Sequence, residues 1–196
     1  MIYPATYDIT ILQNSTWKAA LRATQERVVI EDITVSGGSA LFMGDCHGLE
    51  ADDAVVITAA AEATVPCGLV LNSVYYVLAS GLTNDQFYAS ATISGSPVSI
   101  DGAGSGIFYA AKPVNLSGYT IDADITGILD NVQVATFACS ITNAPLGVFE
   151  MSMTPAVSSG IETGRYNYDV SLTSSSGERY YWLTGVATVQ RTYSRN

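Results

Sequence analysis

Residues that perform acid–base and nucleophilic chemistry are scarce in this chain. His47 is the only histidine, and Cys46 directly precedes it. A nucleophile needs a base within hydrogen-bond reach, whereas neighbours along a strand point to opposite faces. We therefore predict a structural role for His47, no catalytic residues, and a protein that is not an enzyme.

Carboxylates are more frequent, and their spacing was compared with that of known sites. Asp45, Glu50, Asp52 and Asp53 lie close together, but not at the spacing of a calcium-binding loop. Asp122 and Asp124 fall on one polar strand face, whereas glycoside hydrolysis needs carboxylates on opposite sides of a groove. We interpret both sets as solvated surface and predict no metal and no cofactor.

The cysteines and the hydropathy pattern indicate the cellular compartment in which the chain is made. Cys46, Cys67 and Cys139 are an odd set without CxxC spacing, which argues against a secreted disulfide framework. The first ten residues lack the basic and apolar regions of a signal peptide. No apolar run reaches the length of a membrane span. We expect a soluble product of a host cytoplasm, with no membrane insertion.

The surface charge restricts the class of partner. Charged residues make up 13% of the chain and the net charge is −10. An acidic surface repels phosphate backbones, and no three of the eight basic residues cluster, so direct binding of nucleic acid is not expected. A weakly charged surface also suits a protein whose faces are partly covered by neighbouring subunits.

Aromatic residues provide the stronger functional lead. The chain has 12 Tyr and two Trp, and large amphipathic rings dominate the energetics of many interfaces. Tyr180, Tyr181 and Trp182 are consecutive, and Tyr166 and Tyr168 lie on the preceding segment. We predict that these five form a protein interface; the alternative is that the consecutive three pack within the chain.

These aromatics belong to the clearest strand pair in the sequence. In residues 164–173, Tyr166, Tyr168, Val170 and Leu172 alternate with polar residues, which predicts a strand with one apolar face. Residues 174–177 supply a turn. On the return strand, strict alternation puts Tyr181, Leu183, Ala187 and Val189 on one face, and Tyr180, Trp182 and Val186 on the other.

Similar alternation recurs elsewhere, at residues 7–11, 17–21, 119–126 and 149–153, with one short helical turn near residues 154–161. Together these segments predict an all-β fold, with about seven strands in an antiparallel sandwich.

The middle of the chain differs in composition. Residues 31–112 are rich in Gly, Ala, Ser and Asp, with short strand patterns at residues 54–58, 74–78, 87–91 and 107–110. This segment holds nine acidic residues and one basic residue, a net charge of −8. We predict a small, acidic, barrel-like β domain at 31–112, inserted into a discontinuous sandwich formed by residues 1–30 and 113–196.

The flanking segments resemble a known family. The motifs are NLSGY at Asn115–Tyr119, GRYNYD at Gly164–Asp169, and Gly185 within the last strand. They are similar to small bacteriophage tail and baseplate proteins, whose Ig-like β-sandwich resembles the N-terminal domain of upper baseplate proteins. Within the middle segment, HGLEADDAVVIT and GSPVSIDGAGSG resemble a small β module that recurs in virion proteins, notably of cyanophages.

The resemblance implies a non-enzymatic virion structural protein. In that family the sandwich is an attachment platform, so the expected partners are other tail, baseplate, neck or fibre proteins in a symmetric, multi-copy assembly. Two alternatives stay open: a receptor- or glycan-binding module of the tail, and a capsid decoration protein.

Overall fold

A computed structural model describes residues 5–192 of the chain. The described residues are nearly all β, with one five-residue helix, α1 (Pro155–Ser159). They divide into two compact units. We call residues 1–23 with 115–196 the sandwich unit, and residues 24–114 the barrel unit.

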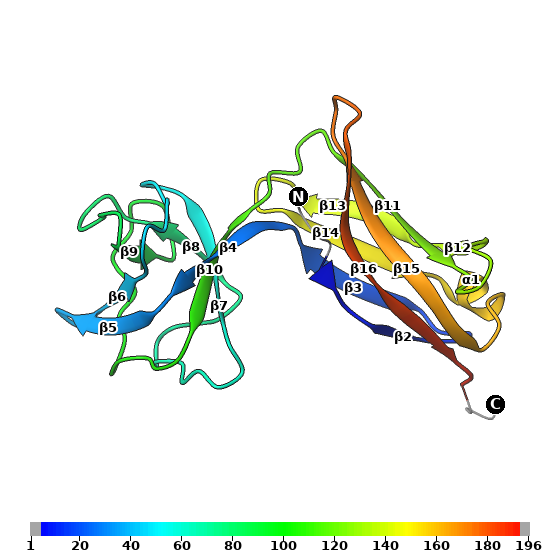
Figure 1. The fold of residues 1–196 in the computed structure, drawn as a ribbon, viewed down its shortest axis with the longest axis horizontal. Coiled ribbons are helices and arrows are strands. Elements are labelled where there is room, and N and C mark those ends of the chain that lie inside the picture. The colour runs from blue at the N-terminus through cyan, green and yellow to red at the C-terminus, as the bar shows by residue number, and fades with distance from the viewer. Residues whose placement is uncertain (1–4, 193–196) are drawn as a thin grey trace. The chain divides into compact units, whose positions relative to one another are not determined.

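The sandwich unit contains two sheets (Figure 1). The strands of the large sheet, in order of pairing, are β1 (Ala5–Thr6), β16 (Arg179–Gln190), β15 (Gly164–Thr173), β11 (Thr120–Thr126) and β12 (Gln133–Thr136), and β2 (Ile9–Leu12) also pairs with β16. The small sheet consists of β13 (Ala138–Asn143), β14 (Val148–Met153) and β3 (Trp17–Arg22). The prediction of an all-β sandwich is confirmed, with one addition: β1 and β2 pair with β16 in parallel.

Alternating residues build the core between these sheets. Val170 and Leu172 of β15 are buried, as are Phe149, Met151 and Met153 of β14. The ring of Trp182 on β16 meets that of Phe149 on β14 edge to face, with centroids 5.6 Å apart. Burying one face of each sheet against the other supplies most of the driving force for this unit.

The barrel unit is a single seven-stranded sheet that curls onto itself. Its strands pair in the order β4 (Thr24–Ile30), β10 (Phe108–Pro113), β7 (Ala54–Ala59), β8 (Val74–Val77), β9 (Gln86–Ser90), β6 (Ser39–Met43) and β5 (Asp32–Ser36). The first and last strands of this order are consecutive in the chain and are separated by Glu31, whose N–H donates to the carbonyl of Met43. One bent segment therefore supplies both end strands of the sheet, with β4 paired to β10 and β5 paired to β6.

The unit boundaries differ from those predicted. The composition predicts that residues 24–30 belong to the sandwich and that the insert ends at residue 112. In the structure β4 pairs with β10 in the barrel unit, with Ile30 opposite Phe108, and the unit ends at Val114. The physical reason is that Ile30, Phe108 and Ala110 are all buried in the core of that unit.

Candidate protein interface

Tyr168, one of the five predicted interface residues, lies in the core. Its side chain is 2% exposed, and its hydroxyl donates to the carbonyl of Tyr7. Burial, followed by the nearby Asp8, raises the pKa of this phenol to about 12. The hydroxyl therefore stays protonated and ties β15 to the N-terminal segment, so the assignment of Tyr168 to an exposed interface is corrected.

Gly185 explains how that contact fits. It is paired with Tyr168 across the ladder, and a Cβ atom there would overlap the carbonyl oxygen of Tyr7 and lie 2.9 Å from the Tyr168 ring. The chain between β1 and β2 approaches β16 closely at this point, where the N–H of Tyr7 donates to the carbonyl of Thr184. A glycine is needed because a side chain would occupy the space taken by Tyr7.

Tyr166 lies two residues earlier and is only half-buried. Its hydroxyl donates to the carbonyl of Glu162, 3.0 Å away, so it fastens the loop that precedes β15. The Tyr166 ring is partly accessible, but its hydroxyl already forms a hydrogen bond within the chain.

Trp182 also lies elsewhere than predicted, because β16 contains a β-bulge. Val170 is paired with Leu183 and Ser171 with Tyr181, which leaves Trp182 as the extra residue. A bulge places two residues opposite one on the partner strand, so strict alternation fails here. Trp182 and the buried Leu183 both contact the core, whereas Tyr181 lies opposite Ser171 on the outer face. The predicted faces of Tyr181 and Trp182 are therefore reversed.

Of the five predicted interface residues, Tyr180 and Tyr181 are the two that are exposed, at 44% and 53%. The guanidinium of Arg179 lies 5.5 Å from the centroid of the Tyr181 ring and donates to the hydroxyl of Ser171 at 2.9 Å. The Tyr180 hydroxyl donates to Glu178, and this bond raises the phenol's pKa. These contacts pre-order both rings without burying them, which lowers the entropic cost of docking a partner.

Tyr180 is paired with the core residue Leu172 and Tyr181 with Ser171, so the two rings lie on opposite faces of β16. The outer face, which carries Tyr181, also carries two neighbouring carboxylates. Asp124 of β11 and Asp169 of β15 are directly opposite each other, an arrangement that destabilises a sheet when both are ionised. Burial first, and then the nearby Asp124, raise the pKa of Asp169, while Arg179 lowers it in part.

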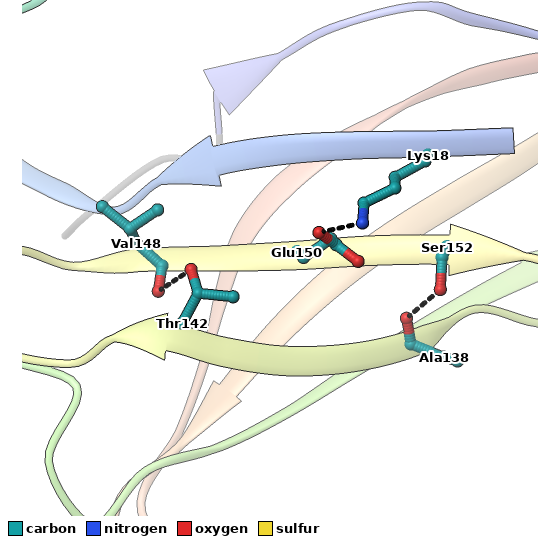
Figure 2. A network of polar contacts seen from close by, with 6 residues as sticks. All are labelled: Lys18, Ala138, Thr142, Val148, Glu150 and Ser152. Atoms are coloured by element: carbon teal, nitrogen blue, oxygen red, sulfur yellow. Dashed lines mark hydrogen bonds and ion pairs between the residues drawn. The ribbon is translucent and has the colours of Figure 1, made fainter.

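The outer face of the small sheet, in contrast, is satisfied within the chain (Figure 2). Lys18 and Glu150 form an ion pair at 2.6 Å. The hydroxyls of Thr142 and Ser152 donate to the backbone carbonyls of Val148 and Ala138. Short side chains bonded to their own sheet offer little to a partner, so the candidate interface lies on the large sheet.

The histidine and the carboxylates that could support chemistry are buried or dispersed. The His47 ring is 4% exposed, lies edge-on to Phe87, and accepts the N–H of Leu49 at its Nδ1. Asp53 pairs with Lys112 and accepts the N–H of Glu50. Residues 5–192 contain no group of three or more His, Cys, Asp or Glu side chains arranged to hold a metal ion.

The three cysteines are free thiols. Cys46 and Cys67 are exposed, and Cys139 is half-buried on β13. Burial, followed by Asp122 and Asp124, raises the pKa of Cys139 to about 11. A thiol that remains protonated at neutral pH is a poor nucleophile.

Comparison with known proteins does not identify a relative: the chain matches no protein-family profile and no curated protein sequence. Within the described part of the chain, no helix is long and apolar enough to cross a membrane.

Proposed function

We propose that this chain is a non-enzymatic structural protein of a bacteriophage virion, which docks tail, baseplate, neck or fibre components in several symmetric copies. The observation that carries the proposal is the exposed pair Tyr180 and Tyr181 on an otherwise well-packed hairpin. Aromatic rings beside an arginine are the usual anchors of protein interfaces. The resemblance of Asn115–Tyr119 and Gly164–Asp169 to motifs of tail and baseplate proteins supports the same proposal.

The test is to look for the chain in particles. Mass spectrometry of purified virions of the phage that encodes it should detect the protein, and cryo-electron microscopy should place it in the tail, baseplate or neck in symmetric copies. A chain that is made during infection but is absent from particles would contradict the proposal.

A paired substitution makes the role of the tyrosines measurable. Changing Tyr180 and Tyr181 together to Ser should lower incorporation by about tenfold or more, because interface aromatics contribute roughly 2 kcal/mol or more each. The melting temperature should hardly change, since both rings are exposed. Ile93→Ser, at a position 61% exposed in the barrel unit, is the matched control and should leave incorporation unchanged.

A glycan-binding role is the second candidate, and the Tyr181–Arg179 arrangement favours it. An exposed ring can stack on a sugar face while a guanidinium donates to hydroxyls. Binding of the purified chain to a glycan array, lost in Tyr181→Ser, would support this role. Binding to particles without binding to glycans would favour the first.

A further inference from the structure

The large sheet has an open edge along half of β11. Strand β12 pairs with β11 only at residues 124–126. The chain then crosses at Phe137 and continues in the small sheet as β13. Residues 120–123 of β11 therefore have β15 on one side, and no strand of the described chain pairs with them on the other.

The backbone at this edge is oriented to accept another strand. The N–H of Phe137 donates to the carbonyl of Ala123 at 2.9 Å, so the peptide groups of Ala123 point away from β15. Backbone groups alternate along an antiparallel strand, and hence the N–H and C=O of Ile121 point the same way. These are the donors and acceptors that an added strand would use.

A groove follows this edge. It has a volume of about 360 Å³ and is lined by Tyr119, Thr120 and Ile121 on one side, and by Cys139, Ser140 and Ile141 on the other. The second wall is β13, which is the edge strand of the small sheet. Two unpaired strand edges with half-buried apolar side chains between them suit an extended peptide with apolar residues at every second position.

The charge beside the groove indicates the other positions of such a peptide. Asp122 is exposed and directly follows Ile121 on β11, and Asp124 lies two residues further along the strand. Neither forms an ion pair within the described chain. Basic side chains would complement them. A second copy of this chain, with a net charge of −10, is a poorer match for the same reason.

We propose that this groove binds an extended segment of another protein, in which apolar residues alternate with Lys or Arg, as an added strand on β11. The proposal rests on the function proposed above and assigns it a second contact, at the free edge of β11 and on the opposite sheet face from Tyr181. The apolar residues pack against Ile121 and Ile141, and the basic residues lie beside Asp122. The edge at Asp124 is already paired with β12, and its carboxylate accepts from Gln133 and Thr136.

Cys139 provides a direct test, because it lines the groove. Alkylation of the full chain by iodoacetamide at pH 9 is followed by mass spectrometry, with and without a peptide of about nine residues in which Lys and Val alternate. Alkylation of Cys139 should slow by about fivefold or more, since an added strand covers the thiol. Cys46 and Cys67 are exposed in the barrel unit and serve as internal controls with unchanged rates.

Three further peptides separate strand addition from other binding. A peptide of alternating Lys and Ser tests the contribution of charge alone, and a peptide of alternating Glu and Val tests the sign of the charge. A Lys–Val peptide with a central Pro lacks one backbone N–H donor. None should protect Cys139. Protection by the Lys–Ser or the Pro peptide equal to that by the Lys–Val peptide, or no protection by the Lys–Val peptide at millimolar concentration, would overturn the proposal.

Matched variants locate the contact. Ile121→Lys places a like charge at the groove and should abolish protection by the Lys–Val peptide, whereas Val134→Lys, at a position 40% exposed outside it, should not. Circular dichroism verifies that both variants fold. If either does not fold, protection of Cys139 in the unsubstituted chain still tests the proposal. The two proposals can be contradicted independently. If the chain is found in particles but the peptide does not protect Cys139, only the groove proposal is wrong. If the peptide protects Cys139 but the chain is absent from particles, only the virion proposal is wrong.

Discussion

The two halves of the β15–β16 hairpin use aromatic residues in opposite ways. In the half next to the N-terminal segment, Tyr168 is buried over Gly185 and bonded to Tyr7. In the half next to the turn, Tyr180 and Tyr181 are exposed and held by Glu178 and Arg179. The bulge at Trp182 separates the halves. A single hairpin can thus combine a rigid anchor with an ordered but accessible surface, and substitutions in each half should have different effects.

The largest effect is expected at Gly185. A Cβ atom there would overlap the Tyr7 carbonyl and crowd the Tyr168 ring, so Gly185→Ala should destabilise the sandwich unit by about 3 kcal/mol or more. Urea unfolding followed by tryptophan fluorescence measures this, because both Trp17 and Trp182 lie in that unit. Gly160→Ala, where the nearest atom lies 3.5 Å from the added Cβ, should change stability by less than about 0.5 kcal/mol. Equal effects of the two would mean that the anchor tolerates a side chain.

A smaller effect is expected from removing one hydroxyl. Tyr168→Phe leaves the Tyr7 carbonyl without its side-chain donor and should cost about 1–2 kcal/mol. In Tyr166→Phe the lost bond is exposed, so the cost should be below about 0.5 kcal/mol. Denaturant midpoints of the two variants give the difference directly. If Tyr166→Phe proved the more costly, the assignment of the anchor to Tyr168 would be wrong.

The smallest effect is on the outer face, and it depends on pH. The pKa of Asp169 is raised in the folded chain, so the ionised carboxylate destabilises the fold. This destabilisation is absent below the unfolded pKa of about 3.9. The destabilisation grows as the pH rises from the pKa of Asp169 in the unfolded chain to its higher pKa in the folded chain. Above the folded pKa it reaches its full size. Asp169→Asn should therefore raise the melting temperature near pH 7 and leave it unchanged near pH 3.

Glu162→Gln, at an exposed position of the same unit, is the control and should show no such pH-dependent gain. A gain for Asp169→Asn that was equal at both pH values would remove the electrostatic explanation.

The sequence predicts most of the strands but not how they depart from regularity. Alternation in residues 164–173, 119–126 and 149–153 marks β15, β11 and β14, because each buries one face only. The bulge at Trp182 could not be predicted, since one extra residue reverses the faces without any change in composition. Strict alternation therefore put Tyr181 on the same face as Leu183, and Trp182 on the opposite face.

Long-range pairing was the other source of error. Nothing within residues 24–30 indicates whether that strand pairs with the sandwich or with β10, because both offer apolar neighbours. The groove beside β11 was likewise missed, because it exists only where the chain leaves one sheet at Phe137 and joins the other. Local patterns specify strands, whereas edges and boundaries depend on partners far along the chain.

The pairing of Thr24 with Pro113 has an evolutionary consequence. The two ends of the barrel unit leave it on adjacent strands, roughly 5 Å apart, which is the width of an ordinary surface turn. A gene segment that encodes such a unit can be gained, lost or exchanged by recombination without stretching the recipient protein. Removal of the barrel unit would therefore require only a short turn between residues 23 and 115 of the sandwich unit.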